Sequence, residues 1–140
     1  MEPNVIWVDK MTDWSTAAKK ILELAKGRKK FVLQGEIGAG KTTIIQVFCA
    51  LLGVEGAVTS PTFSIVNPYL TSSGETINHL DLYRLKNQQE AIDIGIEDIL
   101  YDDSYCFIEW PEVIEDLLPE DLVVIKITVE PNSKRKILFL

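Results

Sequence analysis

The chain has 140 residues, enough for one domain (1–140) with a hydrophobic core and too few for two domains of ordinary size. Hydrophobic residues make up 46% of the sequence, which is typical of globular proteins, and no apolar run approaches the length of a membrane span. The net charge of −7 argues against a large direct contact with nucleic acid, because nucleic-acid-binding surfaces are usually basic.

Strands and helices alternate along the first half of the chain. Short apolar runs predict strands at 5–8 and 29–34. Capping residues and apolar periodicity predict a helix at 12–25, ended by Gly27, and a second helix at 43–52. This alternation is typical of α/β proteins.

Strand signals dominate the second half. Segments 63–70 and 75–82 alternate in polarity around the turn sequence TSSG, which predicts an antiparallel hairpin. The run YCFI at 105–108 is continuously apolar, as in a strand buried on both faces of a sheet. The remaining predicted elements are helices at 88–100, with a break at Gly95, and 111–118, and strands at 122–129 and 136–140. The expected fold is α/β, with a mixed, mostly parallel sheet flanked by helices and an antiparallel hairpin.

The two cysteines, Cys49 and Cys106, lie in apolar segments and have no metal-ligand spacing. Both fit the pattern of reduced core residues in a cytosolic protein. The first residues, MEPN, lack the basic start of a signal peptide. We therefore expect a cytoplasmic protein.

Residues 35–42 read GEIGAGKT, a complete G-x-x-x-x-G-K-T phosphate loop between a predicted strand and a predicted helix. Glycines let backbone N–H groups cradle phosphate oxygens, the lysine reaches the terminal phosphates, and the threonine hydroxyl serves magnesium. The positive end of the following helix favours the same anion. A chance glycine-rich turn is the alternative, but the order of strand, loop, Lys-Thr and helix argues against it. The sequence predicts a P-loop NTPase domain whose nucleotide contacts include Glu36, Gly38, Ala39, Gly40, Lys41, Thr42 and Thr43.

Such an NTPase needs an acidic side chain at the end of a second buried strand, to hold magnesium. Glu109 ends the continuous apolar strand 105–108, whereas Asp81 lies within the alternating segment 76–84, which we expect to have one buried face fewer. Central strands deliver their carboxyl ends to the ligand crevice, so we assign Glu109, with Thr42, to magnesium. Asp81 is assigned to the γ-phosphate side, where it could orient the attacking water. The alternatives are a carboxylate at a helix N-terminus for Glu109 and a salt bridge to Arg84 for Asp81.

Three other residues carry weaker signals. Thr62, in the sequence SPTF, follows the phosphate-loop helix where related NTPases sense the γ-phosphate, although Ser-Pro-Thr alone indicates only a turn. His79 is the one histidine of the chain, and a lone histidine is more often structural than catalytic. Trp110 follows Glu109 and could be a core residue.

Taken together, GEIGAGKTT at 35–43, SPTF at 60–63, HLDLYR at 79–84 and EWPE at 109–112 resemble the bacterial TsaE (YjeE) ATPase family. The resemblance covers nearly the whole chain, and the HxDxYR and EW motifs are its specific part. One departure is Glu36-Ile37, where the family more often has Asp-Leu. The family takes part in making threonylcarbamoyladenosine, a modified base beside the anticodon of certain tRNAs.

The resemblance implies ATP and Mg²⁺ as cofactors and a weak ATPase activity that serves a larger assembly with the TsaB and TsaD proteins. It implies that tRNA contacts are indirect and can belong to those partners. It also implies that residues 38–43 bind phosphates, that His79 and Asp81 lie near the γ-phosphate, that Trp110 shapes the site, and that Arg135 lies against the base.

Three other readings compete with this one. A small GTPase would need an Asn-Lys-x-Asp motif, which the sequence lacks. A small P-loop kinase that phosphorylates a metabolite would usually carry an arginine-rich lid, but Arg28, Arg84 and Arg135 are scattered. A regulatory module that binds ATP without hydrolysing it stays open, because Asp81 and Glu109 would suit binding as well as turnover.

Overall fold

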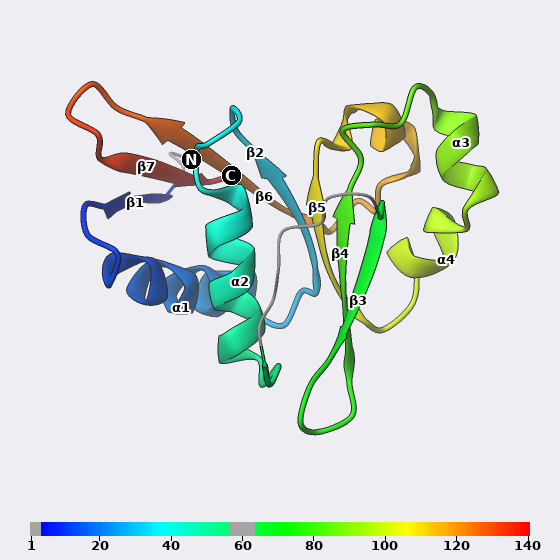
Figure 1. Cartoon of the computed structure of the whole chain (residues 1–140), viewed down its shortest axis with the longest axis horizontal. Helices are drawn as coiled ribbons and strands as arrows, with labels where there is room; N and C mark the ends of the chain where they lie inside the picture. Colours follow the sequence, from blue (N-terminus) through cyan, green and yellow to red (C-terminus); the bar gives the residue numbers. More distant parts are fainter. Residues whose placement is uncertain (1–3, 57–63) are drawn as a thin grey trace.

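The computed structural model describes residues 4–56 and 64–140, which form a seven-stranded sheet with helices on both faces (Figure 1). The strands are β1 (Asn4–Val8), β2 (Lys30–Gln34), β3 (Val66–Leu70), β4 (Thr76–Asp81), β5 (Tyr105–Glu109), β6 (Val123–Val129) and β7 (Arg135–Phe139). The helices are α1 (Asp13–Ala25), α2 (Lys41–Leu51), α3 (Gln88–Asp93), α4 (Ile96–Leu100) and the 3₁₀ helix η1 (Pro111–Leu117). None of the helices in these ranges is long and apolar enough to cross a membrane.

The strand order is β1-β7-β6-β2-β5-β4-β3. The four inner strands, β6, β2, β5 and β4, run parallel to one another, and β3, β7 and β1 are antiparallel to their neighbours. The parallel strands therefore end at one common edge, which is where α/β proteins bind ligands. The predicted α/β fold, with its mixed sheet and its hairpin of β3 and β4, is confirmed.

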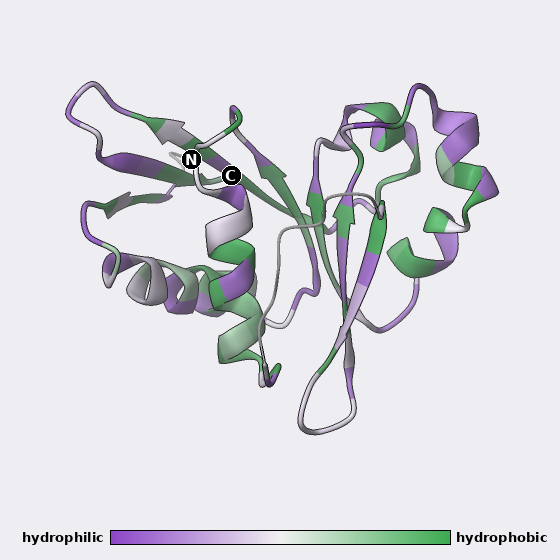
Figure 2. Ribbon diagram, viewed as in Figure 1, coloured by the Kyte–Doolittle hydropathy of each residue, from purple (hydrophilic) through white to green (hydrophobic). Residues whose placement is uncertain are grey.

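Alternation along the inner strands creates two cores. Phe31 and Phe107 pack towards α1 and α2, while Val32 and Ile108 face the α3, α4 and η1 side. Figure 2 shows hydrophobic residues along the inner strands, whereas the helices mix hydrophobic and hydrophilic residues. The Phe48 ring of α2 stacks on Phe107 with a centroid distance of 4.9 Å, so α2 is fixed against β5. Burying one such ring stabilises the fold by roughly 1.5–3 kcal/mol.

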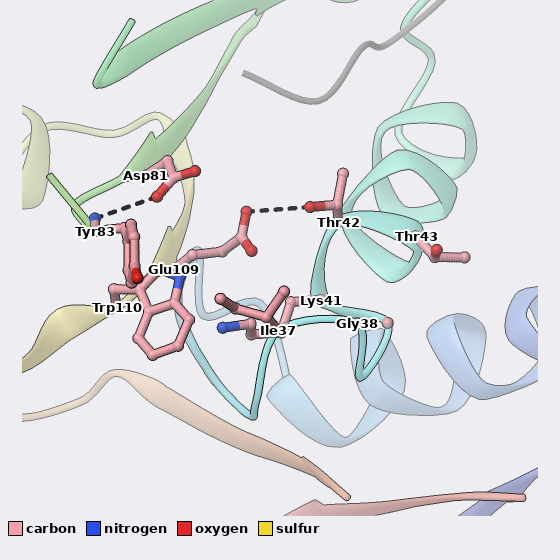
Figure 3. A pocket seen from close by; sticks show the side chains of 10 residues that line it. Ile37, Gly38, Lys41, Thr42, Thr43, Asp81, Tyr83, Glu109 and Trp110 are labelled. Carbon is pink, nitrogen blue, oxygen red and sulfur yellow. Dashed lines mark hydrogen bonds between the residues drawn. The ribbon is translucent and has the colours of Figure 1, made fainter. Parts of the chain in front are cut away.

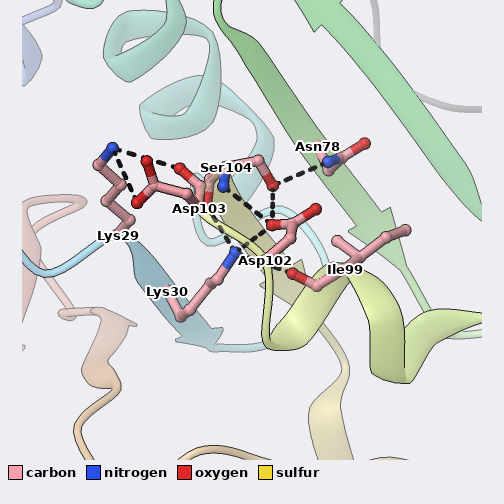
Figure 4. Close-up of polar contacts among 7 residues, drawn as sticks. All are labelled: Lys29, Lys30, Asn78, Ile99, Asp102, Asp103 and Ser104. Carbon is pink, nitrogen blue, oxygen red and sulfur yellow. Dashed lines mark hydrogen bonds and ion pairs between the residues drawn. The ribbon is translucent and has the colours of Figure 1, made fainter.

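A buried lysine joins β2 to the turn before β5 at the other edge of the sheet (Figure 4). The Lys30 Nζ donates to Asp102 Oδ1 at 2.8 Å and to the carbonyl oxygens of Ile99 and Ser104 at 2.8 and 2.6 Å. Asn78 of β4 joins the same network through the Ser104 hydroxyl at 3.1 Å. These bonds satisfy a buried cation and tie the amino ends of β2, β4 and β5 together.

The break at Gly95 and the burial of β4 test two expectations about local structure. The predicted break at Gly95 is confirmed, because Gly95 takes a φ of +83° between α3 and α4. The expectation that the strand of Asp81 has one buried face fewer is wrong, since residues 77–80 of β4 are all buried. Its polar residues find partners on neighbouring elements, Ser104 for Asn78 and Glu109 for His79, so both faces of β4 can be covered.

Candidate active site

The phosphate loop joins the end of β2 to the start of α2. Gly40 precedes the helix with a φ of +116°, a conformation that favours glycine, and its carbonyl accepts the first helical hydrogen bond from Ile44 at 2.9 Å. The first N–H groups of a helix have no acceptor within the helix, and together with the helix dipole they form a site for an anion. The fold thus places an anion-binding backbone where the sequence predicts one.

Trp14 of α1 supports this loop from behind. The side chain is only 6% exposed. A Cβ atom at Gly40 would lie 2.4 Å from the Cη2 atom of Trp14, which is too close for any side chain. The tryptophan and the glycine therefore fit each other, and the position of α1 helps to define the shape of the loop.

Arg135 at the start of β7 holds the loop from another side. Its Nε donates to the carbonyl oxygen of Ala39 at 3.1 Å, and its Nη1 donates to that of Ser133 at 2.7 Å. A cavity of about 230 Å³ opens beside the loop here. The residues that line it are Val8, Asp9, Lys10, Met11, Trp14, Gly38, Gly40, Thr43, Ser133 and Arg135.

Asp81 and Glu109 end neighbouring parallel strands and are paired in the register of the sheet. Glu109 also pairs with Leu33 of β2, so the carboxylates lie at the strand edge from which the phosphate loop departs. The Thr42 hydroxyl lies 3.5 Å from Glu109 Oε2 (Figure 3). Asp81 Oδ1 accepts a hydrogen bond from the N–H of Tyr83 at 3.2 Å. The two acids expected from the sequence therefore meet the phosphate loop around one cavity.

That cavity has a volume of about 320 Å³, within the range of sites for small ligands. The residues that line it are Ile37, Gly38, Gly40, Lys41, Thr42, Thr43, Asp81, Tyr83, Glu109 and Trp110. Ile37 and Tyr83 were not among the predicted site residues. Both fall inside the motifs GEIGAGKT and HLDLYR, and this membership was the available signal.

The Lys41 amine is the cation of this cavity. It is buried, its Nζ has no hydrogen-bond partner among the described residues, and it lies 3.5 Å from the centroid of the Trp110 ring. Burial lowers the pKa of Lys41, and the negative charges of Glu109, Asp81 and Glu112 partly oppose this change. A buried ammonium without a hydrogen-bonding anion is poised to take one, and phosphate oxygens would satisfy it.

Trp110 adopts a left-handed conformation, with a φ of +58°, directly before Pro111 begins η1. Such a backbone costs of order 1–3 kcal/mol for a residue other than glycine, and residues of this kind cluster at functional sites. The conformation turns the indole onto the Lys41 amine and against Tyr83, whose ring centroid lies 5.0 Å away. Trp110 thus forms a wall of the cavity, as Figure 3 shows.

Three predicted site residues in the described part of the chain line neither cavity. Glu36 is exposed and Ala39 is buried. His79, the third, is fully buried, and its Nε2 lies 2.6 Å from Glu109 Oε2. Thr62 and the rest of the SPTF segment, residues 60–63, fall outside the described residues. The structure thus connects His79 to a carboxylate rather than to the space that a phosphate could fill.

The donor set suits magnesium bound together with a phosphate. Within residues 4–56 and 64–140, no three His, Cys, Asp or Glu side chains converge to hold a metal by themselves. Magnesium at nucleotide sites needs only one or two protein oxygens, since phosphates and water complete its octahedron. The Thr42 hydroxyl and the Glu109 carboxylate provide such a pair in the cavity that the Lys41 amine also lines.

Known proteins that resemble this chain share one description. The family model "Threonylcarbamoyl adenosine biosynthesis protein TsaE" matches residues 8–137. Among curated relatives, the tRNA threonylcarbamoyladenosine biosynthesis protein TsaE of Treponema pallidum is 35% identical over 124 residues, which are 89% of this chain and 88% of the relative. The protein of the same name from Bacillus subtilis is 34% identical over 122 residues, 87% of this chain and 75% of the relative.

A solved structure agrees with these matches. The crystal structure of YdiB from Bacillus subtilis superposes with a TM-score of 0.73 and 26% sequence identity. The match covers 99% of this chain and 84% of that one, so the likeness extends over the whole sheet and its helices.

Proposed function

Because the chain belongs to the TsaE family of threonylcarbamoyl adenosine biosynthesis proteins, we propose that it is an Mg²⁺-dependent ATPase that converts ATP and water to ADP and phosphate. One observation carries the proposal. The Lys41 amine and the Thr42 hydroxyl of a phosphate loop face two strand-end carboxylates, Asp81 and Glu109, around one cavity. Phosphate binding, a metal ligand and a water-orienting acid are the three parts that an NTPase site requires.

Each side chain has a role that follows from its place. Lys41 binds the terminal phosphates with a cation that has no hydrogen-bond partner in the part of the chain that the structure describes. Thr42 and Glu109 hold magnesium, which when bound offsets negative charge on the phosphate oxygens. Asp81 lies half-buried at the cavity, where its carboxylate orients the attacking water. The Trp110 indole keeps the Lys41 amine on the cavity side.

The nucleoside occupies the second cavity, on the α1 side of the loop. Both cavities share Gly38, Gly40 and Thr43, so one molecule can extend around the loop from phosphates to base. The Trp14 edge and the Arg135 guanidinium line the second cavity, which suits a flat aromatic base. Arg135 therefore has two tasks, holding the loop at Ala39 and contacting the base.

Hydrolysis serves tRNA threonylcarbamoyladenosine modification in the cytoplasm, through action on the TsaB–TsaD pair. The family descriptions support the pathway, and the net charge of −7 supports indirect rather than direct contact with tRNA. The chain acts as one ATPase domain within that larger assembly.

Nucleotide binding is tested with Lys41→Ala, which should nearly abolish ATP affinity in isothermal titration calorimetry. Lys20→Ala, at an exposed lysine of α1, is the matched control and should bind as the wild type does. Tight ATP binding by Lys41→Ala would contradict the assignment of the phosphate site.

The catalytic role of Asp81 is tested with Asp81→Asn. Hydrolysis should fall by roughly 10²-fold or more, the scale of a positioned acid–base group, while ATP affinity is kept. Asp98→Asn, an exposed aspartate of α4, is the control for the same chemical change. Unchanged turnover in Asp81→Asn would leave this carboxylate with a structural role only.

The biological role is tested by measuring ATP hydrolysis with and without the TsaB–TsaD pair and tRNA, while base modification is followed in the same reaction. We expect both to depend on the three proteins together. Stimulation by a small metabolite, with transfer of phosphate to it, would instead identify a kinase.

A further inference from the structure

The sheet register places His79 beside the metal ligand assigned above. His79 pairs with Phe107 in the β4–β5 ladder, and Asp81 pairs with Glu109 two residues further on. Side chains two residues apart on a strand share a face, so His79, Asp81 and Glu109 all point towards α2 and the phosphate loop. His79 thus lies on the same face as the two acids, two residues before the carboxyl end of β4.

The imidazole holds the carboxylate in a defined place. Its Nε2 lies 2.6 Å from Glu109 Oε2, and the same oxygen lies 3.5 Å from the Thr42 hydroxyl. A ring that carries its proton on Nε2 donates it to the carboxylate, which as an ionised group only accepts. The histidine is fully buried and the glutamate is only 4% exposed, so water does not compete for this bond.

The bond from Nε2 is the one side-chain hydrogen bond of His79 among the described residues. His79 Nδ1 is buried and has no hydrogen-bond partner among the described residues. For packing beside Ile77 and Phe107, an apolar side chain of similar size would serve as well. The hydrogen bond to Glu109, in contrast, requires a side chain with a donor at this position.

We propose that His79 is a positioning residue, which holds the Glu109 carboxylate towards Thr42 so that the two oxygens can bind magnesium together. The inference rests on the proposed nucleotide–metal site and adds a residue that does not touch the nucleotide. Groups that orient a metal ligand typically contribute 10- to 100-fold to metal affinity, and we expect about this effect here.

The test measures ATP affinity across a magnesium titration and again in excess chelator, at constant pH. His79→Leu fills the same space without a donor and should raise the magnesium concentration for half-maximal tight binding about 10- to 100-fold. Its affinity for ATP in chelator should match the wild type. His79→Gln restores an N–H donor at similar reach and should return the magnesium requirement close to that of the wild type. Asn78→Leu removes a buried polar group from the same strand but on the opposite face, and should leave the magnesium requirement unchanged.

Circular dichroism establishes that each variant is folded. His79→Asn, whose shorter amide does not reach Glu109, replaces His79→Leu if that variant does not fold, with the same expected result. A wild-type magnesium requirement in the variant without the donor overturns the inference, as does an equal loss of affinity with and without magnesium. If the wild type itself does not bind ATP, the proposed function fails and the inference fails with it. If the wild type binds ATP with magnesium but the variant without the donor keeps the wild-type magnesium requirement, or loses affinity equally with and without magnesium, the inference fails and the proposed function stands.

Discussion

Gly40→Ala separates the shape of the phosphate loop from its chemistry, because the substitution adds one methyl group and no charge. Gly40 has a φ of +116°, and its Cβ position lies 2.4 Å from Cη2 and 2.8 Å from Cζ2 of Trp14. The Trp14 ring is buried among α1 and core residues, so it cannot simply swing away. The methyl group must therefore displace either the loop or helix α1.

Two contributions set the size of the effect. A non-glycine residue in this backbone region costs about 1–3 kcal/mol. Forcing a methyl group into a packed site costs about 1–3 kcal/mol more. Gly40→Ala should therefore lower the free energy of unfolding by about 2–6 kcal/mol. Gly38→Ala shares the positive φ, +84°, but has no atom within 4 Å of its Cβ position, so it should lose only the first contribution.

These contributions can be measured by urea unfolding of Gly40→Ala and Gly38→Ala. The same measurement on Trp14→Leu and on the double variant Trp14→Leu/Gly40→Ala completes a double-mutant cycle. Trp14→Leu destabilises the chain alone, yet in combination with Gly40→Ala it should recover about 1–3 kcal/mol, the packing contribution. If Gly40→Ala and Gly38→Ala are equally destabilised, or if the effects at Gly40 and Trp14 simply add, the added methyl group does not meet the Trp14 ring.

Three further outcomes are expected. Asp102→Ala should lower the free energy of unfolding by about 1–2 kcal/mol near neutral pH, the low end for a bond to a charged group, because this carboxylate is 45% exposed. Burial alone would raise the pKa of Asp102, but hydrogen bonds from Lys30 and Ser104 bring it below 3.8. The difference from the wild type should therefore be complete above about pH 4 and shrink as the pH falls further, in urea titrations at a series of pH values. Burial raises the pKa of Cys49 to about 11 and that of Cys106 to about 12. Both thiols should therefore react with a thiol reagent only as the chain unfolds, and rapid labelling of the native chain would contradict their burial. Trp110→Leu should lower the affinity for ATP about 2- to 30-fold, which corresponds to the free energy of one cation–π contact, and Trp110→Phe should lower it less. If calorimetry finds that both variants bind ATP as tightly as the wild type, Trp110 is not part of the site.

Much of the fold could be read from the chain because its elements have strong local signals. Apolar runs predicted the strands β2 and β5, and Gly95 separates α3 from α4 as expected. These features depend on residues that are neighbours in sequence, so periodicity and turn chemistry suffice to find them.

The burial of β4 shows where such reasoning fails. Asn78 and His79 are polar, so the strand read as partly exposed, yet both side chains are buried. Their partners, Ser104 and Glu109, are 26 and 30 residues away along the chain. A polar residue next to an unseen partner has the same sequence pattern as one that faces solvent.

The same distinction divides the candidate site. Strand, phosphate loop and helix are contiguous, so local sequence was enough to assign Lys41 and Thr42 to a phosphate and its metal. Only the parallel register of β2, β5 and β4 brings Glu109 to Thr42, 67 residues distant, with His79 behind it. The left-handed turn at Trp110 likewise became visible only in the folded chain, where it lays the indole on Lys41. A motif records what one segment can bind, whereas the contacts that orient its side chains come from segments that the sheet brings together.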